Sequence, residues 1–269
     1  MTNQTNTAVR TVVSKDGTAI AYDLAGSGPA LILVDGALCS RSFGPMPDLS
    51  KHLQSNFTVY NYDRRGRGDS GNVLPYSPER EVEDLAALVD AAGGSAFLVG
   101  LSSGGGLTLR AAAAGVNAPK IAVYETPYMV DPEHKTPSDM QGDLDRFIAK
   151  DDRAGALRYF MVDMVGQPAF SMIFMRAMSK VWKQLKAVAP TLPYDARVMD
   201  NFVPNLESFA GISQPALVMR GGKAAGWMTR AVESLAKTLP HSTYKVLPKQ
   251  THQVKSSAIA PSLIEFFTS

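Results

Sequence analysis

The 269-residue sequence has a single cysteine, Cys39, which excludes an internal disulfide and a zinc site built from several cysteines. It also lacks a strong charge of either sign, because 27 Lys and Arg stand against 25 Asp and Glu and the formal net charge is +2. A charge this small gives no broad field that would attract a polyanion. We therefore expect no nucleic-acid partner.

Long apolar runs are absent as well. No stretch approaches the roughly 18 apolar residues that a membrane-spanning helix needs. Residues 1–7 are polar and contain no apolar segment of the kind found in secretory signals. We therefore expect a cytoplasmic protein with no membrane partner.

Short apolar runs are present, and they recur with helical stretches between them. They lie at 31–34, 59–62, 96–99 and 121–124. Continuous apolar strands separated by helices are typical of a parallel sheet covered on both faces. Before them, Asp16-Gly17 between β-prone runs at 12–14 and 20–22 indicates a hairpin. The sequence predicts an α/β fold.

The alternation of strands and helices stops after residue 126 and resumes with a strand at 216–219. In between, methionines accumulate and prolines divide the chain into short helical stretches. We interpret 127–213 as an inserted helical cap. Residues 1–126 and 214–269 would then form the core domain.

One motif carries a chemical meaning. Gly100-Leu101-Ser102-Ser103-Gly104 follows the apolar run 96–99 and opens an alanine-rich helical stretch at 105–114. A strand that turns sharply into a helix through G-x-S-x-G is a nucleophile elbow, in which glycines relieve crowding and one hydroxyl is exposed. Ser102 is therefore the candidate nucleophile.

A serine hydroxyl needs a neighbouring base, and the chain has four histidines. His252 lies in a loop at 248–253, just after the last predicted strand. That order after the nucleophile, at the end of a strand, makes His252 the candidate base. The others are less suitably placed: His241 lies in a turn, His52 in a helical stretch and His134 in a proline-rich loop.

Attack on a carbonyl creates an oxyanion that needs two N–H donors. We expect one from the backbone of Ser103, the residue after the nucleophile, and the other from Ala37, in the loop after the strand at 31–34. A glycine turn that only ends this strand is the alternative reading of 35–38.

Over essentially its whole length the chain resembles the α/β-hydrolase superfamily. Besides the elbow, the cap and His252, residues 62–70 (Tyr-Asp-Arg-Arg-Gly-Arg-Gly-Asp-Ser) resemble the family's D-x-R-G-x-G-x-S loop. The resemblance implies a mostly parallel central sheet with helices on both faces and an inserted helical cap. It also implies that Asp63 and 65–70 are structural.

The chain departs from the family pattern in two places. Asp35 replaces the common histidine before Gly36, and we expect its side chain to point away from the oxyanion or to form a structural hydrogen bond. The turn that usually bears the triad acid reads Gly221-Gly222-Lys223-Ala224-Ala225-Gly226, with no carboxylate.

Another carboxylate must then orient the histidine. By the resemblance, Glu125 is the candidate, since it ends the strand at 121–124 and some lipases place their acid there. Asp131, Asp163 and Asp200 are rivals.

The resemblance implies a serine hydrolase that uses no cofactor and no metal. Its substrate would be a small molecule with an apolar acyl group, cleaved at an ester, lactone or thioester bond. Carbon–carbon bond hydrolysis and perhydrolysis would use the same residues. A non-catalytic ligand-binding protein on the same fold is a further alternative.

Overall fold

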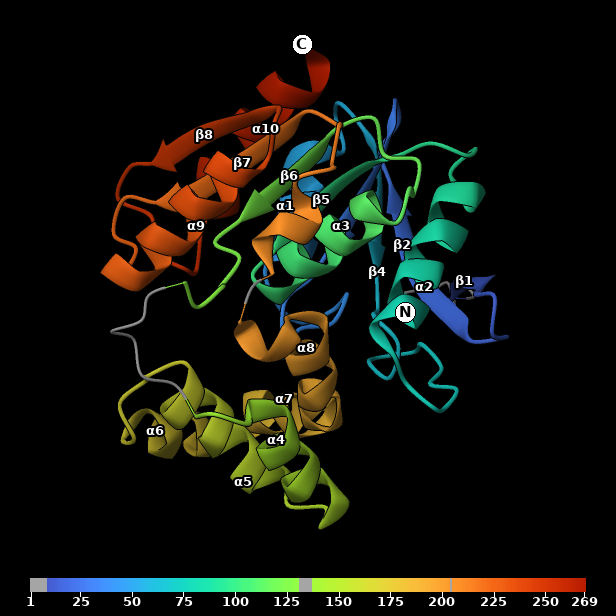
Figure 1. Ribbon diagram of the computed structural model, residues 1–269. Coiled ribbons are helices and arrows are strands. Elements are labelled where there is room, and N and C mark those ends of the chain that lie inside the picture. The colour runs from blue at the N-terminus through green and yellow to red at the C-terminus, as the bar shows by residue number, and fades with distance from the viewer. Residues whose placement is uncertain (1–8, 131–136, 204) are drawn as a thin grey trace, which may run out of the picture.

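The computed structural model describes residues 9–130, 137–203 and 205–269. These residues form one eight-stranded sheet in the order β1-β2-β4-β3-β5-β6-β7-β8 (Figure 1). Pairing is antiparallel for β1 with β2 and β2 with β4, and parallel for every other neighbouring pair. The strands are β1 (Arg10–Val13), β2 (Ala19–Ala25), β3 (Ala30–Val34), β4 (Thr58–Tyr62), β5 (Phe97–Leu101), β6 (Ile121–Tyr124), β7 (Ala216–Gly221) and β8 (Ser242–Leu247).

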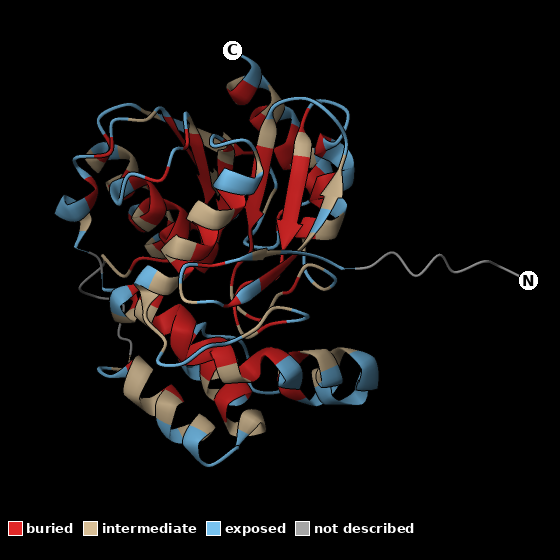
Figure 2. Ribbon diagram, turned by 90° about the vertical axis from the view of Figure 1, so that its right-hand side faces the viewer, coloured by how far each residue is buried: buried red, intermediate tan, exposed pale blue. Residues whose placement is uncertain are grey.

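Helices cover both faces of the sheet, because its central strands are apolar on both sides. In β3, Leu31 and Leu33 pack with α1 (Met46–Leu53) and α10 (Ser256–Thr268). Ile32 and Val34 belong to the larger cluster on the opposite face. That face is covered by α2 (Pro78–Ala91), α3 (Ser103–Ala113) and α9 (Gly226–Thr238), and Figure 2 shows the buried residues concentrated between sheet and helices. The predicted α/β architecture is confirmed.

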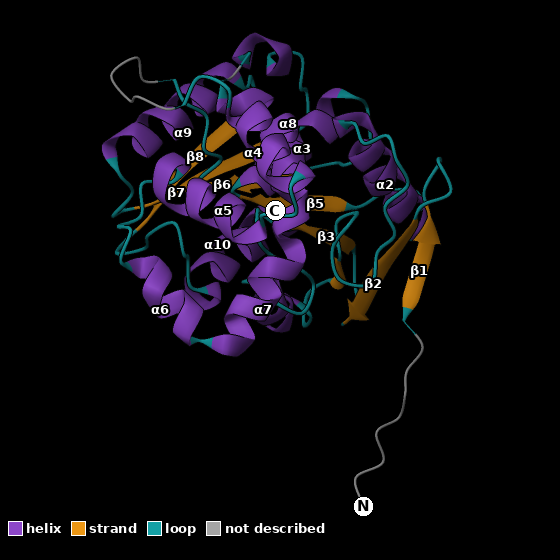
Figure 3. Cartoon of the chain, turned by 90° about the horizontal axis from the view of Figure 1, so that it is seen from below, coloured by secondary structure: helices purple, strands orange, loops and turns teal. Residues whose placement is uncertain are grey.

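A series of short helices connects β6 to β7. In its described part this connection contains no strand. Seen from below, its helices lie in front of the sheet (Figure 3). They are α4 (Met140–Ala149), α5 (Arg153–Arg158), the π-helix η1 (Tyr159–Met164), α6 (Ser171–Ala177), α7 (Ser179–Val188), η2 (Ala189–Thr191), α8 (Leu192–Val198), η3 (Asp200–Phe202) and η4 (Leu206–Phe209).

We call 127–213 the cap from here on; its separation as a domain from a core of 1–126 and 214–269 stays a prediction. Within it, α8 differs from its neighbours because almost all of its residues are buried, and it packs on α3 of the core. No helix in the described ranges combines the length and apolarity that crossing a bilayer requires.

The loop after β4 is held by buried charges. Asp63 accepts hydrogen bonds from the backbone N–H groups of Arg41, at 2.8 Å, and Asp69, at 2.9 Å. Arg65 forms a bidentate pair with Asp84 of α2, at 2.7 and 2.8 Å. The loop therefore fastens the sheet to α2 and the β3–α1 connection.

Candidate active site

Ser102 lies at the sharp turn between β5 and α3, with φ 55° and ψ −127°. This backbone conformation is strained for a residue with a side chain. The positions two residues before and two residues after it must be glycines, since a Cβ on Gly100 would lie 2.4 Å from the carbonyl oxygen of Gly104, and one on Gly104 would lie 2.2 Å from that of Val34. The motif thus forms the strained turn that the sequence predicts.

His252 lies beside this serine. Its Nε2 is 3.2 Å from Ser102 Oγ, and its side chain is 46% exposed. Two hydrogen bonds hold the loop around it: Tyr124 OH donates to the Thr251 carbonyl at 2.6 Å, and Lys223 N donates to the Gln250 carbonyl at 2.9 Å. The backbone just before His252 is therefore held by residues at or just beyond the ends of β6 and β7.

Glu125 follows β6 directly and contacts the other nitrogen of this ring. Its Oε2 is 2.9 Å from His252 Nδ1, and its side chain is 1% exposed. Its Oε1 accepts a hydrogen bond from Gly221 N at 2.8 Å, so the carboxylate is anchored to the end of β7. The φ of Glu125 is 44°, in the left-handed region. The turn after β7 has no carboxylate of its own, and Glu125 brings one to the end of this strand.

The rival acids and remaining histidines that the structure describes have other partners or positions. Asp163 pairs with Arg158 at 3.2 Å, and Asp200 accepts from Arg110 at 2.5 Å. His52 Nδ1 lies 2.9 Å from the Asp48 carbonyl on α1. This helix covers the face of the sheet opposite to α3. The remaining two candidates, Asp131 and His134, are outside the described residues, and His241 lies in the turn that precedes β8.

Ala37 and Ser103 both line the cavity that contains Ser102 and His252. Ser103 is the first residue of α3, so its N–H belongs to the positive end of the helix. Ala37 is in the loop after β3, where Leu38 has a φ of 63°. Because the N-terminal end of a helix favours negative charge, the N–H of Ser103 is suited to an anionic oxygen in this cavity.

The cavity has a volume of about 910 Å³ and lies between core loops and cap helices. Its cap side is largely apolar. Methionines supply much of the lining, and their flexible side chains can adapt to ligands of different shape. The cap supplies Met129, Met140, Met161, Met164 and Met175, and α9 supplies Met228.

Asp35 is a buried carboxyl beside the oxyanion loop, 2% exposed. Its Oδ1 accepts a hydrogen bond from Gly36 N at 3.0 Å, which is the structural bond that the sequence leaves open. Its Oδ2 has no hydrogen-bond partner among the described residues. Burial raises the pKa of Asp35 to about 7, although Arg67 acts in the opposite direction. Burial also raises the pKa of the Cys39 thiol, which keeps this side chain protonated.

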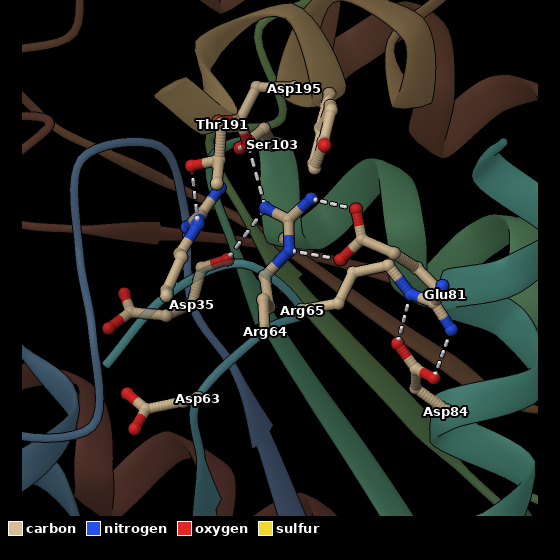
Figure 4. A network of polar contacts seen from close by, with 12 residues as sticks. Asp35, Asp63, Arg64, Arg65, Glu81, Asp84, Ser103, Thr191 and Asp195 are labelled. Carbon is tan, nitrogen blue, oxygen red and sulfur yellow. Dashed lines mark hydrogen bonds and ion pairs between the residues drawn. The ribbon is translucent and has the colours of Figure 1, made fainter. Parts of the chain in front are cut away.

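A buried ion-pair network lies next to Ser103, and the sequence does not reveal it (Figure 4). Arg64 lies between Glu81 of α2 and Asp195 of α8, and all three are buried. The only signal in the sequence is the density of arginines in the loop after β4. Nothing indicates which carboxylates meet them, because Asp195 is 131 residues from Arg64 along the chain.

Within the described ranges, no group of three or more His, Cys, Asp or Glu side chains is arranged to hold a metal ion.

The sequence model of the Alpha/beta hydrolase family matches residues 26–261. The chain belongs to this family. An alpha/beta hydrolase from Sphaerobacter thermophilus is 47% identical, with a TM-score of 0.90 over 96% of this chain and 100% of that one.

Two esterases share the fold of this alpha/beta hydrolase at lower identity. The esterase from Thermogutta terrifontis is 21% identical, with a TM-score of 0.75 over 97% of this chain and 98% of the other. An esterase from a Rhodococcus species is also 21% identical, with a TM-score of 0.69 and the same coverage of 97% and 98%. Curated protein sequences give no match.

Proposed function

We propose that this protein is a cofactor-free serine hydrolase that cleaves an ester, lactone or thioester through an acyl-enzyme on Ser102. The observation that carries the proposal is the continuous contact from Ser102 Oγ to His252 Nε2 and from His252 Nδ1 to Glu125 Oε2. A nucleophile, a base and an orienting acid in this order are the parts of a serine triad.

In the proposed reaction, Ser102 Oγ attacks the substrate carbonyl while His252 Nε2 takes the hydroxyl proton. The N–H groups of Ala37 and Ser103 donate to the oxyanion that forms. His252 then gives its proton to the leaving alcohol or thiol, and the acyl group stays on Ser102. A water molecule, deprotonated by the same nitrogen, then attacks the acyl carbonyl. The bond between the acyl group and Ser102 Oγ breaks, His252 returns the proton to Oγ, and the carboxylic acid product leaves.

Glu125 would hold the imidazole in the correct tautomer and stabilise its cation. Its carboxylate suits this role, because a backbone N–H fixes one oxygen while the other faces the ring. The absence of an acid in the usual turn is the main argument for a non-catalytic binding protein. The contact of Glu125 with His252 Nδ1 argues against that reading and supports the enzyme. The esterase neighbours agree with this choice.

We further propose that the cap closes the cavity over the serine and that the substrate is a small molecule with an apolar acyl group. The apolar lining of the cavity supports this substrate class.

A fluorophosphonate probe tests the proposal, since only an activated serine reacts readily with it. We expect wild type to be labelled at Ser102 and Ser102→Ala not to be labelled. Glu125→Gln should lower kcat on a chromogenic ester by at least about a hundredfold with little change in KM, because the lost interaction strengthens as the imidazolium forms.

Undiminished ester turnover by Ser102→Ala would overturn the assignment of the nucleophile. Near-normal turnover by Glu125→Gln would remove Glu125 from the triad without affecting Ser102. An unlabelled wild-type protein that hydrolyses no ester would leave the binding protein as the better account.

A further inference from the structure

Asp195 of α8 binds directly to the residue that follows the proposed nucleophile. It is 0% exposed, and its Oδ1 accepts hydrogen bonds from Ser103 Oγ at 2.8 Å and from Arg64 Nη1 at 2.7 Å. Its Oδ2 accepts from Arg67 Nη2 at 2.7 Å. A carboxylate of the cap therefore fixes the side chain whose own backbone N–H is one of the proposed oxyanion donors.

The same carboxylate reaches the second donor through Arg67. Nη1 of this arginine donates to the Gly36 carbonyl at 2.6 Å and to the Cys39 carbonyl at 3.4 Å. These two carbonyls flank Ala37 in the loop. Arg64 adds a longer contact, from Nη1 to the Asp35 carbonyl at 3.3 Å. Both arginines that hold this loop are in turn held by Asp195.

The charges of this cluster balance. Arg64 also pairs with Glu81, at 2.6 and 2.7 Å, so that two guanidinium groups meet two carboxylates in a buried region. Burial alone would raise the pKa of Asp195, but Arg67 and Arg64 outweigh it and lower the pKa. Asp195 is therefore ionised at neutral pH, and its ion pairs and hydrogen bonds are of the strong, charge-assisted kind.

We propose that Asp195 is a positioning residue that fixes both N–H donors of the oxyanion hole, through Ser103 Oγ on one side and Arg67 on the other. The inference rests on the proposed function. Donors of this kind act only if they are held close to the position of the oxyanion, and small displacements lower the rate. Through Asp195, the cap would thus support the chemical step as well as the cavity.

The decisive variant is Asp195→Asn, which keeps the shape but leaves Arg64 and Arg67 with one carboxylate between them. We expect kcat on a short acetyl ester to fall at least about thirtyfold while KM stays within about twofold, because the oxyanion forms only in the transition state. The rate of fluorophosphonate labelling should fall in parallel. Ser103→Ala keeps the N–H and removes one contact of Asp195, and should lower kcat about fivefold.

Asp84→Asn is the matched control, because Asp84 is 1% exposed and forms a bidentate pair with Arg65. Arg65 lies in the same loop as Arg64 and Arg67, but its hydrogen bonds go to Asp84, Asp16 and the Arg80 carbonyl and do not involve Ser103 or residues 35–39. Each of the two substitutions removes one buried negative charge from its arginine partners, so both should destabilise the fold. All rates are measured at a temperature where circular dichroism shows each variant folded.

We expect the control to keep kcat within about twofold of wild type. Equal losses of kcat in Asp84→Asn and Asp195→Asn would mean that Asp195 has only a structural role. Should Asp195→Asn not fold, Ser103→Ala decides, and a wild-type rate in it would overturn the inference. If wild type itself takes no probe, the proposed function fails; a labelled wild type with equally fast Asp195→Asn refutes the inference alone.

Discussion

Asp35 is in an environment very different from that of an ordinary surface carboxyl. It is almost completely buried, one of its oxygens is without a partner among the described residues, and burial raises its pKa from 3.8 to about 7. An ionised carboxylate here would oppose an oxyanion formed at the neighbouring loop. The proton of Asp35 therefore affects stability and, under the proposed function, catalysis.

The pH dependence of stability follows from the sign of this shift. A carboxyl whose pKa is raised on folding binds its proton more tightly in the folded state, so its contribution to the free energy of unfolding is greatest below about pH 4. This contribution declines from about pH 4 to about pH 7 and is constant above that range. Asp35→Asn removes the titration.

Relative to wild type, the free energy of unfolding of Asp35→Asn should therefore rise by about 2–3 kcal/mol between pH 5 and pH 8. Urea denaturation of both proteins at each pH unit measures it. Parallel curves for the two proteins across this range would show that Asp35 does not titrate there.

At the scale of elements, the turn from β5 into α3 depends on a close approach of two backbones. A Cβ on Gly104 would lie 2.2 Å from the Val34 carbonyl oxygen and 2.6 Å from that of Asp35, both of them backbone atoms. Neither atom can move without displacing the end of β3 and the loop that carries Ala37.

Gly104→Ala should therefore lower the free energy of unfolding by more than about 2 kcal/mol, as overpacking of a tight core does. The control is Gly211→Ala, where an added Cβ meets nothing within 4 Å, and we expect it to stay within about 0.5 kcal/mol of wild type. Urea denaturation compares the two variants. A wild-type stability for Gly104→Ala would contradict the close packing described for the elbow.

The central strands are readable from the sequence because β3, β5 and β6 are continuous, almost wholly apolar runs. The run expected at 121–124 coincides with β6, and that at 59–62 differs from β4 by one residue. The elbow is readable because its glycines are required by contacts within the turn. Ser102 and His252 can be named as candidates by their order and their places at strand ends.

Long-range polar contacts are not readable in this way. Glu125 can be named from its place after β6, but its contact with His252 depends on a φ of 44° and on the N–H of Gly221. Asp195 carries no signal at all, because its partners come from β-strand ends and loops more than 90 residues away. Their meeting is a consequence of the complete fold.

At the scale of the whole molecule, the cavity is formed jointly by core and cap, and the cap should set the range of substrates. Met175 of α6 lines the cavity, so Met175→Trp should fill part of it. We expect kcat/KM to fall at least about tenfold for long-chain esters and less than twofold for acetyl esters, since lost space in an apolar pocket costs about 1–3 kcal/mol per group.

Met178→Trp is the matched control, because Met178 is three positions further along the chain and is 57% exposed. It should leave the whole series unchanged. A panel of chromogenic esters of increasing length makes the measurement. Equal losses for acetyl and long-chain esters in Met175→Trp would argue against a cavity that holds the acyl chain.

The burial of Arg64 and Arg67 has a consequence for how this chain could exchange parts with its relatives. Asp195 neutralises part of both positive charges. A graft that replaced all of 127–213 with a foreign insertion would leave the two buried arginines without this carboxylate, unless the insertion supplied another one. A graft that keeps these ion pairs must therefore keep α8 together with the sheet. Chimeras designed to alter specificity should therefore replace only the part of the cap before α8 and be joined at about the end of α7.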